Sequence, residues 1–278
     1  MKLLGVSRAL RFSPHCEERD AAIFSEVAGL LRAGGCSVET VDEDALQVLP
    51  ACDGVFSMAR SQRALQLLAR AEEQGRAVVN SPARLLLTTR GSLARLFSAN
   101  AVPTPRFWEA RSADPAPEGL AFPLWVKRSE VSTQTRQDVQ FVATAAALPD
   151  ALSSFSSRGI GDVVLVAHVG GDLVKFYGVE GTDFFYFYYP TRDGGFSKFG
   201  LEEHNGSARG YAFSSAALKR AADVAARAGG IYVYGGDAVV EPDGSFSIID
   251  FNDWPTFAPC RDVAAKAIAQ RVVDEVKK

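Results

Sequence analysis

The stretch that decides the fold is Tyr234-Gly235-Gly236-Asp237, followed after a short apolar run by Ile248-Ile249-Asp250-Phe251-Asn252-Asp253-Trp254-Pro255. Between the two segments, Glu241-Pro242-Asp243-Gly244 has the composition of a tight turn, because proline fixes φ and glycine accepts a positive φ. The apolar runs on either side of this turn are therefore predicted to be the two strands of a β-hairpin.

Three oxygen-bearing side chains are expected to converge on this hairpin. Asp237 lies on the first strand, and Asp250 and Asn252 lie two positions apart on the second, so the latter two share one face of the pleat. Carboxylate and amide oxygens are the ligands that Mg²⁺ prefers, with water and substrate phosphates completing its coordination. One interpretation is therefore a nucleotide-bound Mg²⁺ site. The alternative is that Asp250 and Asn252 only cap the turn that follows them, while Asp253 is solvated.

Composition restricts the kind of protein. The chain has 278 residues, of which 47% are hydrophobic and 23% charged, enough for a sizeable core and more than one folding unit. A net charge of -3 and a pI of about 5.7 argue against a general binder of nucleic acid or anionic membranes.

The four cysteines form no C-x-x-C pair and indicate neither a zinc site nor a disulfide framework. No apolar run is long enough to span a membrane and no signal peptide is recognisable, so we expect a cytoplasmic protein.

Strands and helices alternate over the first 80 residues. Strands are predicted over residues 2–6, 36–41, 53–56 and 77–80, and helices over residues 17–33 and 61–74. This alternation is typical of a small parallel α/β lobe, which we assign to residues 1–80. Ligands of open parallel sheets bind beyond the carboxyl ends of the strands, and the loop after the first strand carries Arg8, Arg11 and His15. These three residues either contact a ligand or form a solvated basic loop.

Residues 81–278 mix helices with paired strands. Helices are predicted over residues 84–100, 143–157, 216–228 and 261–276, and strands over residues 122–128, 137–142, 162–169, 173–179 and 184–189. Residues 111–119 are rich in Pro, Ala and Ser and are predicted to be an exposed connection between lobes. Lys175 stands in the middle of an apolar strand, and a buried ammonium group needs an anionic partner. That partner is either a protein carboxylate or a bound phosphate.

The order of these features resembles the ATP-grasp superfamily from about residue 80 to the C-terminus. The resemblance implies the fold class: α/β plus α+β, with two α+β subdomains that clamp ATP behind a small parallel α/β lobe. Within the superfamily, the chain is most similar to the inositol trisphosphate kinases. The segments that carry this likeness are Phe122-Pro123-Leu124-Trp125-Val126-Lys127, Leu173-Val174-Lys175-Phe176-Tyr177-Gly178-Val179, and the hairpin from Val233 to Pro255.

The resemblance also implies roles for particular residues. Lys127 and Lys175 would be the catalytic cations that hold the phosphates of ATP, and Arg90 would be a further phosphate contact. The metal ligands for Mg²⁺ would be Asp237, Asp250 and Asn252. The adenine edge would be read by a backbone hinge and the ribose by a nearby carboxylate, and the residues concerned are Val166, Ala167, His168 and Asp172. Phosphoryl transfer would then depend mainly on neutralising phosphate charge.

Two departures from the family patterns bear on the reaction. The His-Gly pair that inositol phosphate kinases carry in the loop after the first lysine is absent from residues 129–136. Two positions before Asp237, Gly235 stands where many ATP-grasp ligases place an arginine that steadies an acyl phosphate. The first departure argues against an inositol phosphate substrate, and the second argues against a ligase.

Three functions remain open. The first, which we favour at this point, is a kinase that phosphorylates a hydroxyl of an anionic small molecule, such as a polyol or inositol phosphate. The second is a carboxylate–amine ligase that acts through an acyl phosphate, and the third is a nucleotide-binding module without catalysis. The cations expected around the acceptor are Arg8, Arg11, His15, Arg128, Arg136, Lys198 and Arg209.

Overall fold

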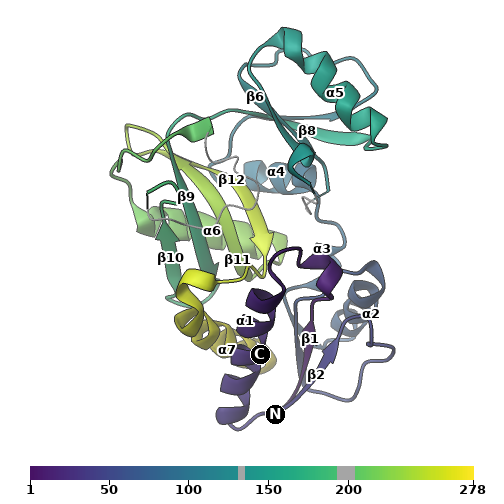
Figure 1. The fold of residues 1–278 in the computed structure, drawn as a ribbon. Helices are drawn as coiled ribbons and strands as arrows, with labels where there is room; N and C mark the ends of the chain where they lie inside the picture. Colours follow the sequence, from purple (N-terminus) through teal and green to yellow (C-terminus); the bar gives the residue numbers. More distant parts are fainter. Residues whose placement is uncertain (131–134, 193–203) are drawn as a thin grey trace.

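Three four-stranded sheets, each covered by helices, make up the molecule (Figure 1). The computed structural model describes residues 1–130, 135–192 and 204–278. One sheet is parallel and the other two are antiparallel, so the predicted combination of an α/β lobe with two α+β subdomains is confirmed.

The N-terminal sheet has the strand order β2-β1-β3-β4 and is parallel throughout. Its elements are β1 (Lys2–Ser7), α1 (Glu17–Ala33), β2 (Ser37–Asp42), β3 (Gly54–Ser57), α2 (Gln62–Glu73) and β4 (Ala77–Val79). Leu3, Val6 and Phe56 are fully buried, as expected for parallel strands that are covered on both faces. Because β1 and β3 are neighbours, the residues that follow them, Arg8 and residues 58–60, emerge side by side at one edge of the sheet.

The second sheet has the order β5-β8-β6-β7 and is antiparallel. Its elements are β5 (Phe107–Arg111), β6 (Leu124–Arg128), β7 (Val139–Val142), α5 (Leu148–Ser157) and β8 (Asp162–Ala167). Leu152 and Phe155 of α5 pack with Leu124 and Val126 of β6 in one apolar core. Strand β5 was not predicted from the sequence; it is an edge strand that ends where the predicted connection of residues 111–119 begins.

The third sheet has the order β10-β9-β11-β12 and contains the hairpin predicted from the sequence. Its strands are β9 (Asp172–Val179), β10 (Phe185–Tyr188), β11 (Val233–Val240) and β12 (Phe246–Asp253), and α6 (Ser215–Gly229) packs on one face. The amide of Gly244, which has a φ of 84°, donates to the carbonyl of Glu241 at 3.0 Å and closes the turn. Asp237 lies opposite Asp250, and the register shifts directly after Asp237.

The helix predicted over residues 84–100 is two helices. The structure has α3 (Pro82–Leu85) and α4 (Arg90–Ala99), with 3₁₀ turns elsewhere at Leu10–Phe12, Arg136–Asp138, Ala145–Ala147 and Ala258–Cys260. The break arises because Thr89 and Ser92 form a capping box, in which each side chain accepts a hydrogen bond from the other residue's amide, at 3.0 and 2.7 Å. As a result, Arg90 stands at the first position of α4.

The last helix, α7 (Arg261–Val276), returns to the N-terminal lobe and lies beside α1 (Figure 1). Ile268 and Val272 of α7 share an apolar core with Ile23 and Val27 of α1 and with Trp254. This core therefore joins residues on both sides of the lobe boundary that we predict at residue 80. None of the described helices has the length and apolar character needed to cross a membrane.

A close backbone approach at Gly236 leads to a stability prediction. A Cβ atom at Gly236 would lie 2.4 Å from the carbonyl oxygen of Asp250 and 2.5 Å from the ring of Phe176. We expect Gly236→Ala to lower the free energy of unfolding by about 1–3 kcal/mol, because the paired strand must shift to make room. Urea denaturation measures the change.

The control is Gly29→Ala in α1, where a Cβ meets nothing within 4 Å. Here the free energy of unfolding is expected to rise by about 0.5–1 kcal/mol. Equal midpoints for Gly236→Ala and the wild type would contradict the close approach.

Candidate functional site

A cavity of about 750 Å³ is bounded by the second and third sheets and by the residues that follow β1 and β3. It has three parts: a cluster of cations and acids at the centre, an apolar part beside it, and an ion-pair network from the N-terminal lobe. Most of the site residues predicted from the sequence line it, namely Arg8, Arg11, Arg90, Lys127, Val166, Ala167, His168, Lys175, Asp237, Asp250 and Asn252.

The central cations come from three different elements. Lys127 lies near the end of β6, and its Nζ donates to the carbonyl of Ile249 on β12 at 3.0 Å. Lys175 lies in the middle of β9, where its Nζ is 3.2 Å from Oδ1 of Asp237. This carboxylate is the protein anion that the burial of Lys175 required. Arg90 reaches the same cavity from the start of α4.

Asp250 is the carboxylate that these cations surround. Burial acts to raise its pKa, but Arg90, Lys127 and Lys175, together with a hydrogen bond from Asn252, outweigh burial and hold the pKa of Asp250 below its usual value. Burial also lowers the pKa of Lys127, against the opposing effect of Asp250. Asp250 therefore stays ionised at neutral pH.

The donor set on the hairpin fits a hard divalent cation. Asp237 and Asp250 lie opposite each other on β11 and β12 and supply carboxylate oxygens. Nδ2 of Asn252 donates to Oδ2 of Asp250 at 3.2 Å, which leaves the amide oxygen of Asn252 available for another contact. Two carboxylates and an amide oxygen are the ligands expected for Mg²⁺, which keeps several water or phosphate ligands of its own.

The apolar part of the cavity lies between strands of both antiparallel sheets. Its walls are the side chains of Val139, Val166, Leu173, Val239 and Ile249. These apolar side chains can contact the uncharged part of a ligand, since ligand pockets are lined mostly by apolar side chains with a few placed polar groups.

Polar groups at the apolar part come from β8 and its end. The amide of Ala167 donates to the carbonyl of Arg106 at 2.9 Å, and the amide of His168 donates to that of Pro123 at 3.0 Å. Nε1 of Trp125 donates to Nδ1 of His168 at 3.1 Å. Burial, together with the neighbouring His204, lowers the pKa of His168.

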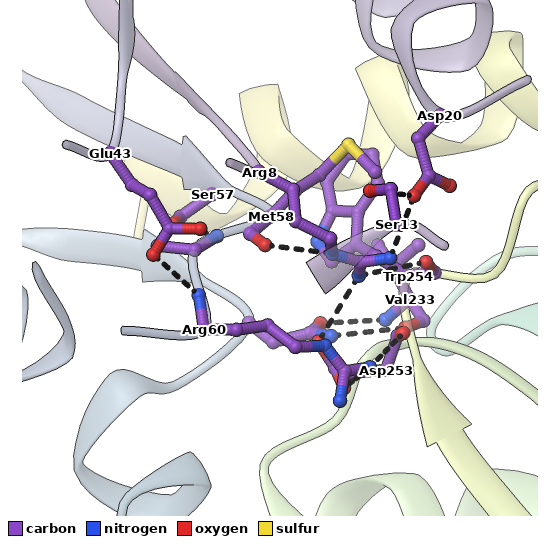
Figure 2. Close-up of polar contacts among 12 residues, drawn as sticks. Arg8, Ser13, Asp20, Glu43, Ser57, Met58, Arg60, Val233, Asp253 and Trp254 are labelled. Carbon is purple, nitrogen blue, oxygen red and sulfur yellow. Dashed lines mark hydrogen bonds and ion pairs between the residues drawn. The ribbon is translucent and has the colours of Figure 1, made fainter. Parts of the chain in front are cut away.

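The third part of the cavity is a network of buried ion pairs (Figure 2). Arg8 donates to Oδ2 of Asp20 at 3.0 Å and to the carbonyl of Trp254 at 3.1 Å. Nη2 of Arg60 is 2.6 Å from Oδ1 of Asp253, and Nη2 of Arg8 is 3.7 Å from the other oxygen of Asp253. The expectation that Asp253 is solvated is therefore wrong: its side chain is 7% exposed, because two arginines of the N-terminal lobe enclose it.

A buried glutamate positions the backbone of both arginine-bearing loops. The carboxylate of Glu43, a residue that is 2% exposed, accepts hydrogen bonds from the amides of Ala9, Arg60 and Ser61, at 2.8, 3.0 and 2.6 Å. Figure 2 shows Glu43 beside Arg60. The backbone beside both arginines is thus anchored by one carboxyl group that accepts three hydrogen bonds.

Asp172, expected near the ribose, lies outside this cavity. It is 3% exposed, and its carboxylate accepts hydrogen bonds from the amides of Arg209, Gly210 and Tyr211, at 2.7, 2.6 and 2.9 Å. Asp172 therefore holds the segment 209–211 against the start of β9. We correct its expected role to that of a structural contact, because its oxygens are already occupied by backbone donors.

The cations expected around an anionic acceptor are largely dispersed. Arg11 lines the cavity but pairs with Asp44 on the surface, and Arg128 pairs with Glu130. Outside the large cavity lie His15 and Arg136, which are exposed, and Arg209, which lines a separate cavity of about 220 Å³. Lys198 lies outside the described residues. Of the seven predicted cations, those that the described part of the chain brings to the cavity are Arg8 and Arg11.

Three residues of the ion-pair network were not predicted: Arg60, Asp20 and Asp253. The signal for Arg60 was present in the sequence, since it follows the third parallel strand as Arg8 follows the first. No comparable signal marked Asp20, which lies within an ordinary amphipathic helix.

Comparison with solved structures identifies the fold. A RimK domain ATP-grasp protein from Sphaerobacter thermophilus superposes with a TM-score of 0.69 at 16% identity, covering 98% of this chain and 100% of that one. The chain has the ATP-grasp fold. D-alanine–D-alanine ligase from Bacillus anthracis in complex with ATP shares this ATP-grasp fold with a TM-score of 0.70 at 12% identity, covering 100% of this chain and 97% of that one. A second structure of the same ligase superposes with a TM-score of 0.67 at 12% identity, covering 100% of this chain and 97% of that one. The sequence matches no protein-family model and no curated protein.

Proposed function

We propose that this protein is an ATP-dependent enzyme that transfers the γ-phosphoryl group of Mg·ATP to a carboxylate and then joins the acyl group to an amine. The observation that carries the ATP-dependent step is the convergence of Lys127, Lys175 and Arg90 with the oxygen ligands of the hairpin in one cavity that also has an apolar part. The likeness in fold to D-alanine–D-alanine ligase and to a RimK domain ATP-grasp protein supports this proposal.

We assign the acceptor to the part of the cavity formed by the buried ion pairs, and the charge there favours a carboxylate over an inositol phosphate. Among the described residues, Arg8 pairs with Asp20 and Asp253, and Arg60 pairs with Asp253. An acceptor that carries several phosphates calls for several cations in excess of nearby acids. Two arginines balanced by two aspartates instead suit an acceptor of low net charge, such as a carboxylic acid that also carries an amino group.

The reaction divides into two balanced steps. A carboxylate oxygen bonds to the γ-phosphorus as the bond from this phosphorus to the β–γ bridging oxygen breaks, and ADP leaves. The amine nitrogen then bonds to the acyl carbon, the carbon–oxygen bond to the phosphate breaks, and orthophosphate leaves with one former carboxylate oxygen while the nitrogen loses a proton.

The side chains of this chain would contribute mainly electrostatics. Lys127 and Lys175 would hold phosphate oxygens in line with the attacking oxygen, and Arg90 would add charge from the start of α4. Mg²⁺ held by Asp237, Asp250 and Asn252 would supply further neutralisation of phosphate charge.

A kinase that acts on a polyol or inositol-phosphate-like hydroxyl is the second candidate, and Gly235 favours it. A Cβ at Gly235 would lie 2.8 Å from Cγ of Pro255 and 3.1 Å from Cδ1 of Tyr177. The strand therefore has no room for a cation at this position, and an acyl phosphate would have to be steadied by another arginine. A hydroxyl acceptor forms no acyl phosphate and lacks this requirement.

Oxygen-18 tracing separates the candidates. The purified protein is incubated with Mg·ATP and a panel of ¹⁸O-carboxylate amino acids, singly and in pairs, and in parallel with polyols and inositol phosphates, and products are read by ³¹P NMR. Orthophosphate that carries one ¹⁸O and appears only with both a carboxylate and an amine is the expected result. A new phosphomonoester would overturn the ligase in favour of the kinase. ATP binding with neither product across the panel would favour the non-catalytic module.

A further inference from the structure

The side chain of one histidine lies among the apolar residues that line the cavity. His168 lines the cavity directly after β8, in the same apolar region as Val166 and Leu173. The cations and hairpin oxygens of the central part would bind the phosphates of a nucleotide. The base would then lie against the apolar residues of the cavity. This inference rests on the proposed use of ATP.

The backbone amides at this point are already engaged within the second sheet. The amide of Ala167 donates to Arg106 and that of His168 donates to Pro123. A backbone N–H has a single hydrogen to donate, so these two amides are not available to a base without breaking the sheet. The hinge that we predicted over Val166, Ala167 and His168 thus lacks two of its amide donors, and a side-chain donor becomes important.

The contact with Trp125 determines which nitrogen of His168 carries the proton. An indole N–H only donates, so Nδ1 of His168, 3.1 Å from Nε1 of Trp125, must accept and is unprotonated. In the neutral ring the proton is then on Nε2, across the ring from Trp125. The lowered pKa of His168, caused by burial and by His204, keeps the ring neutral at pH 7.

Neighbouring residues hold this arrangement in place. The ring of Phe141 packs edge-on against His168 with centroids 5.3 Å apart, and it stacks on His204 at 4.6 Å. Nδ2 of Asn205 donates to the carbonyl of Val169 at 3.1 Å, which ties the segment after β8 to the loop that carries His204. A side chain held on several sides loses little entropy when it binds a ligand.

We propose that the Nε2–H group of His168 donates a hydrogen bond to an acceptor nitrogen on the edge of the adenine ring and so contributes to the choice of nucleobase. Trp125 is a positioning residue in this arrangement, because it fixes the tautomer of His168. The side chain takes over the donor function that the amides of Ala167 and His168 cannot provide.

Calorimetry on full-length variants tests the proposal. We expect His168→Phe to weaken ATP binding about 3- to 10-fold, which is the loss of affinity caused by removing one hydrogen bond. Binding of inorganic tripolyphosphate should be unchanged, because that ligand has no base. His168→Gln, which retains an N–H donor, should recover part of the loss. Gln66→Phe is the control, since Gln66 is exposed on α2 and outside the cavity, and this variant should bind both ligands as the wild type does.

Deaza analogues and tautomer NMR extend the test. One of the three analogues 1-deaza-ATP, 3-deaza-ATP and 7-deaza-ATP should bind the wild type more weakly than ATP does, by the factor that His168→Phe costs in ATP affinity. The His168→Phe variant should bind that analogue and ATP with equal affinity. The ¹⁵N shifts of the His168 ring should report the Nε2–H form, and Trp125→Phe should populate the other tautomer.

The outcomes separate this inference from the proposed function. Unchanged ATP affinity in His168→Phe, or an equal loss for tripolyphosphate, overturns the inference while the ATP-dependent function stands. A wild-type protein that binds neither ATP nor tripolyphosphate overturns the proposed function and this inference with it.

Discussion

Asp250→Asn is expected to lower ADP release from Mg·ATP on the order of 10²–10³-fold, the cost of removing one preorganised charge from a site of phosphoryl transfer. Asp250 is ionised between Arg90 and Lys127, and it is a ligand of the proposed Mg²⁺ site. The amide keeps the shape of the side chain but removes its charge, so the cations repel one another and the metal loses a carboxylate ligand. Steady-state kinetics at several Mg²⁺ concentrations measure the effect.

Asp243→Asn is the matched control for Asp250→Asn. Asp243 is an exposed aspartate in the turn of the same hairpin, where it accepts a hydrogen bond from Ser245 at 2.6 Å. Activity within about twofold of the wild type is expected, since isolated surface contacts contribute little. Circular dichroism of both variants confirms folding. Wild-type turnover by Asp250→Asn would show that the hairpin does not serve the phosphates.

Asp253→Asn is expected to produce the largest loss of stability, about 3–5 kcal/mol in the free energy of unfolding, because it removes the charged partner of buried arginines. The side chains of Arg8 and Asp253 are each 7% exposed, and Arg60 is 19% exposed. The amide leaves Arg60 beside Arg8 with less compensating charge in a region of low dielectric. Urea denaturation followed by fluorescence measures the change.

The exposed pair of Arg11 and Asp44 provides the control. Their side chains are 51% and 53% exposed, so Asp44→Asn is expected to change stability by about 1 kcal/mol or less. A double variant, Asp253→Asn with Arg60→Gln, should recover part of the loss if the penalty arises from an uncompensated charge. Equal unfolding midpoints for Asp253→Asn and Asp44→Asn would show that the network carries no stabilising charge.

Local patterns in the sequence were sufficient for the hairpin and its acids. A Pro-Asp-Gly turn, flanking apolar strands and the spacing of Asp250 and Asn252 predict the pairing, and Asp237 indeed lies opposite Asp250. These features depend on neighbours in the chain, where turn chemistry and the alternation of the pleat operate. The helix break at Thr89 was also encoded locally, but a capping box inside a continuous apolar pattern is easily overlooked.

The pairing of charges depended on the tertiary structure. From the sequence, Arg8 and Arg11 are simply basic residues in a loop, and Asp253 is an acid next to a strand end. Whether an arginine is available to a ligand depends on which acid lies beside it, and Asp253 is 245 positions from Arg8 in the chain. Because that proximity arises only when the hairpin meets the N-terminal lobe, the sequence could not show that Arg8 and Arg60 are balanced by nearby aspartates.

The sequence by itself determined the alternation of the N-terminal lobe, the hairpin, and the lysines and acids that stand on regular strands, because periodicity and turn residues act over a few positions. Only the tertiary structure decided that Asp172 holds a loop, that Asp253 is enclosed by two arginines, and that His168 accepts from Trp125. These contacts join segments far apart in the chain, and burial there gives each charge or hydrogen bond its energetic weight.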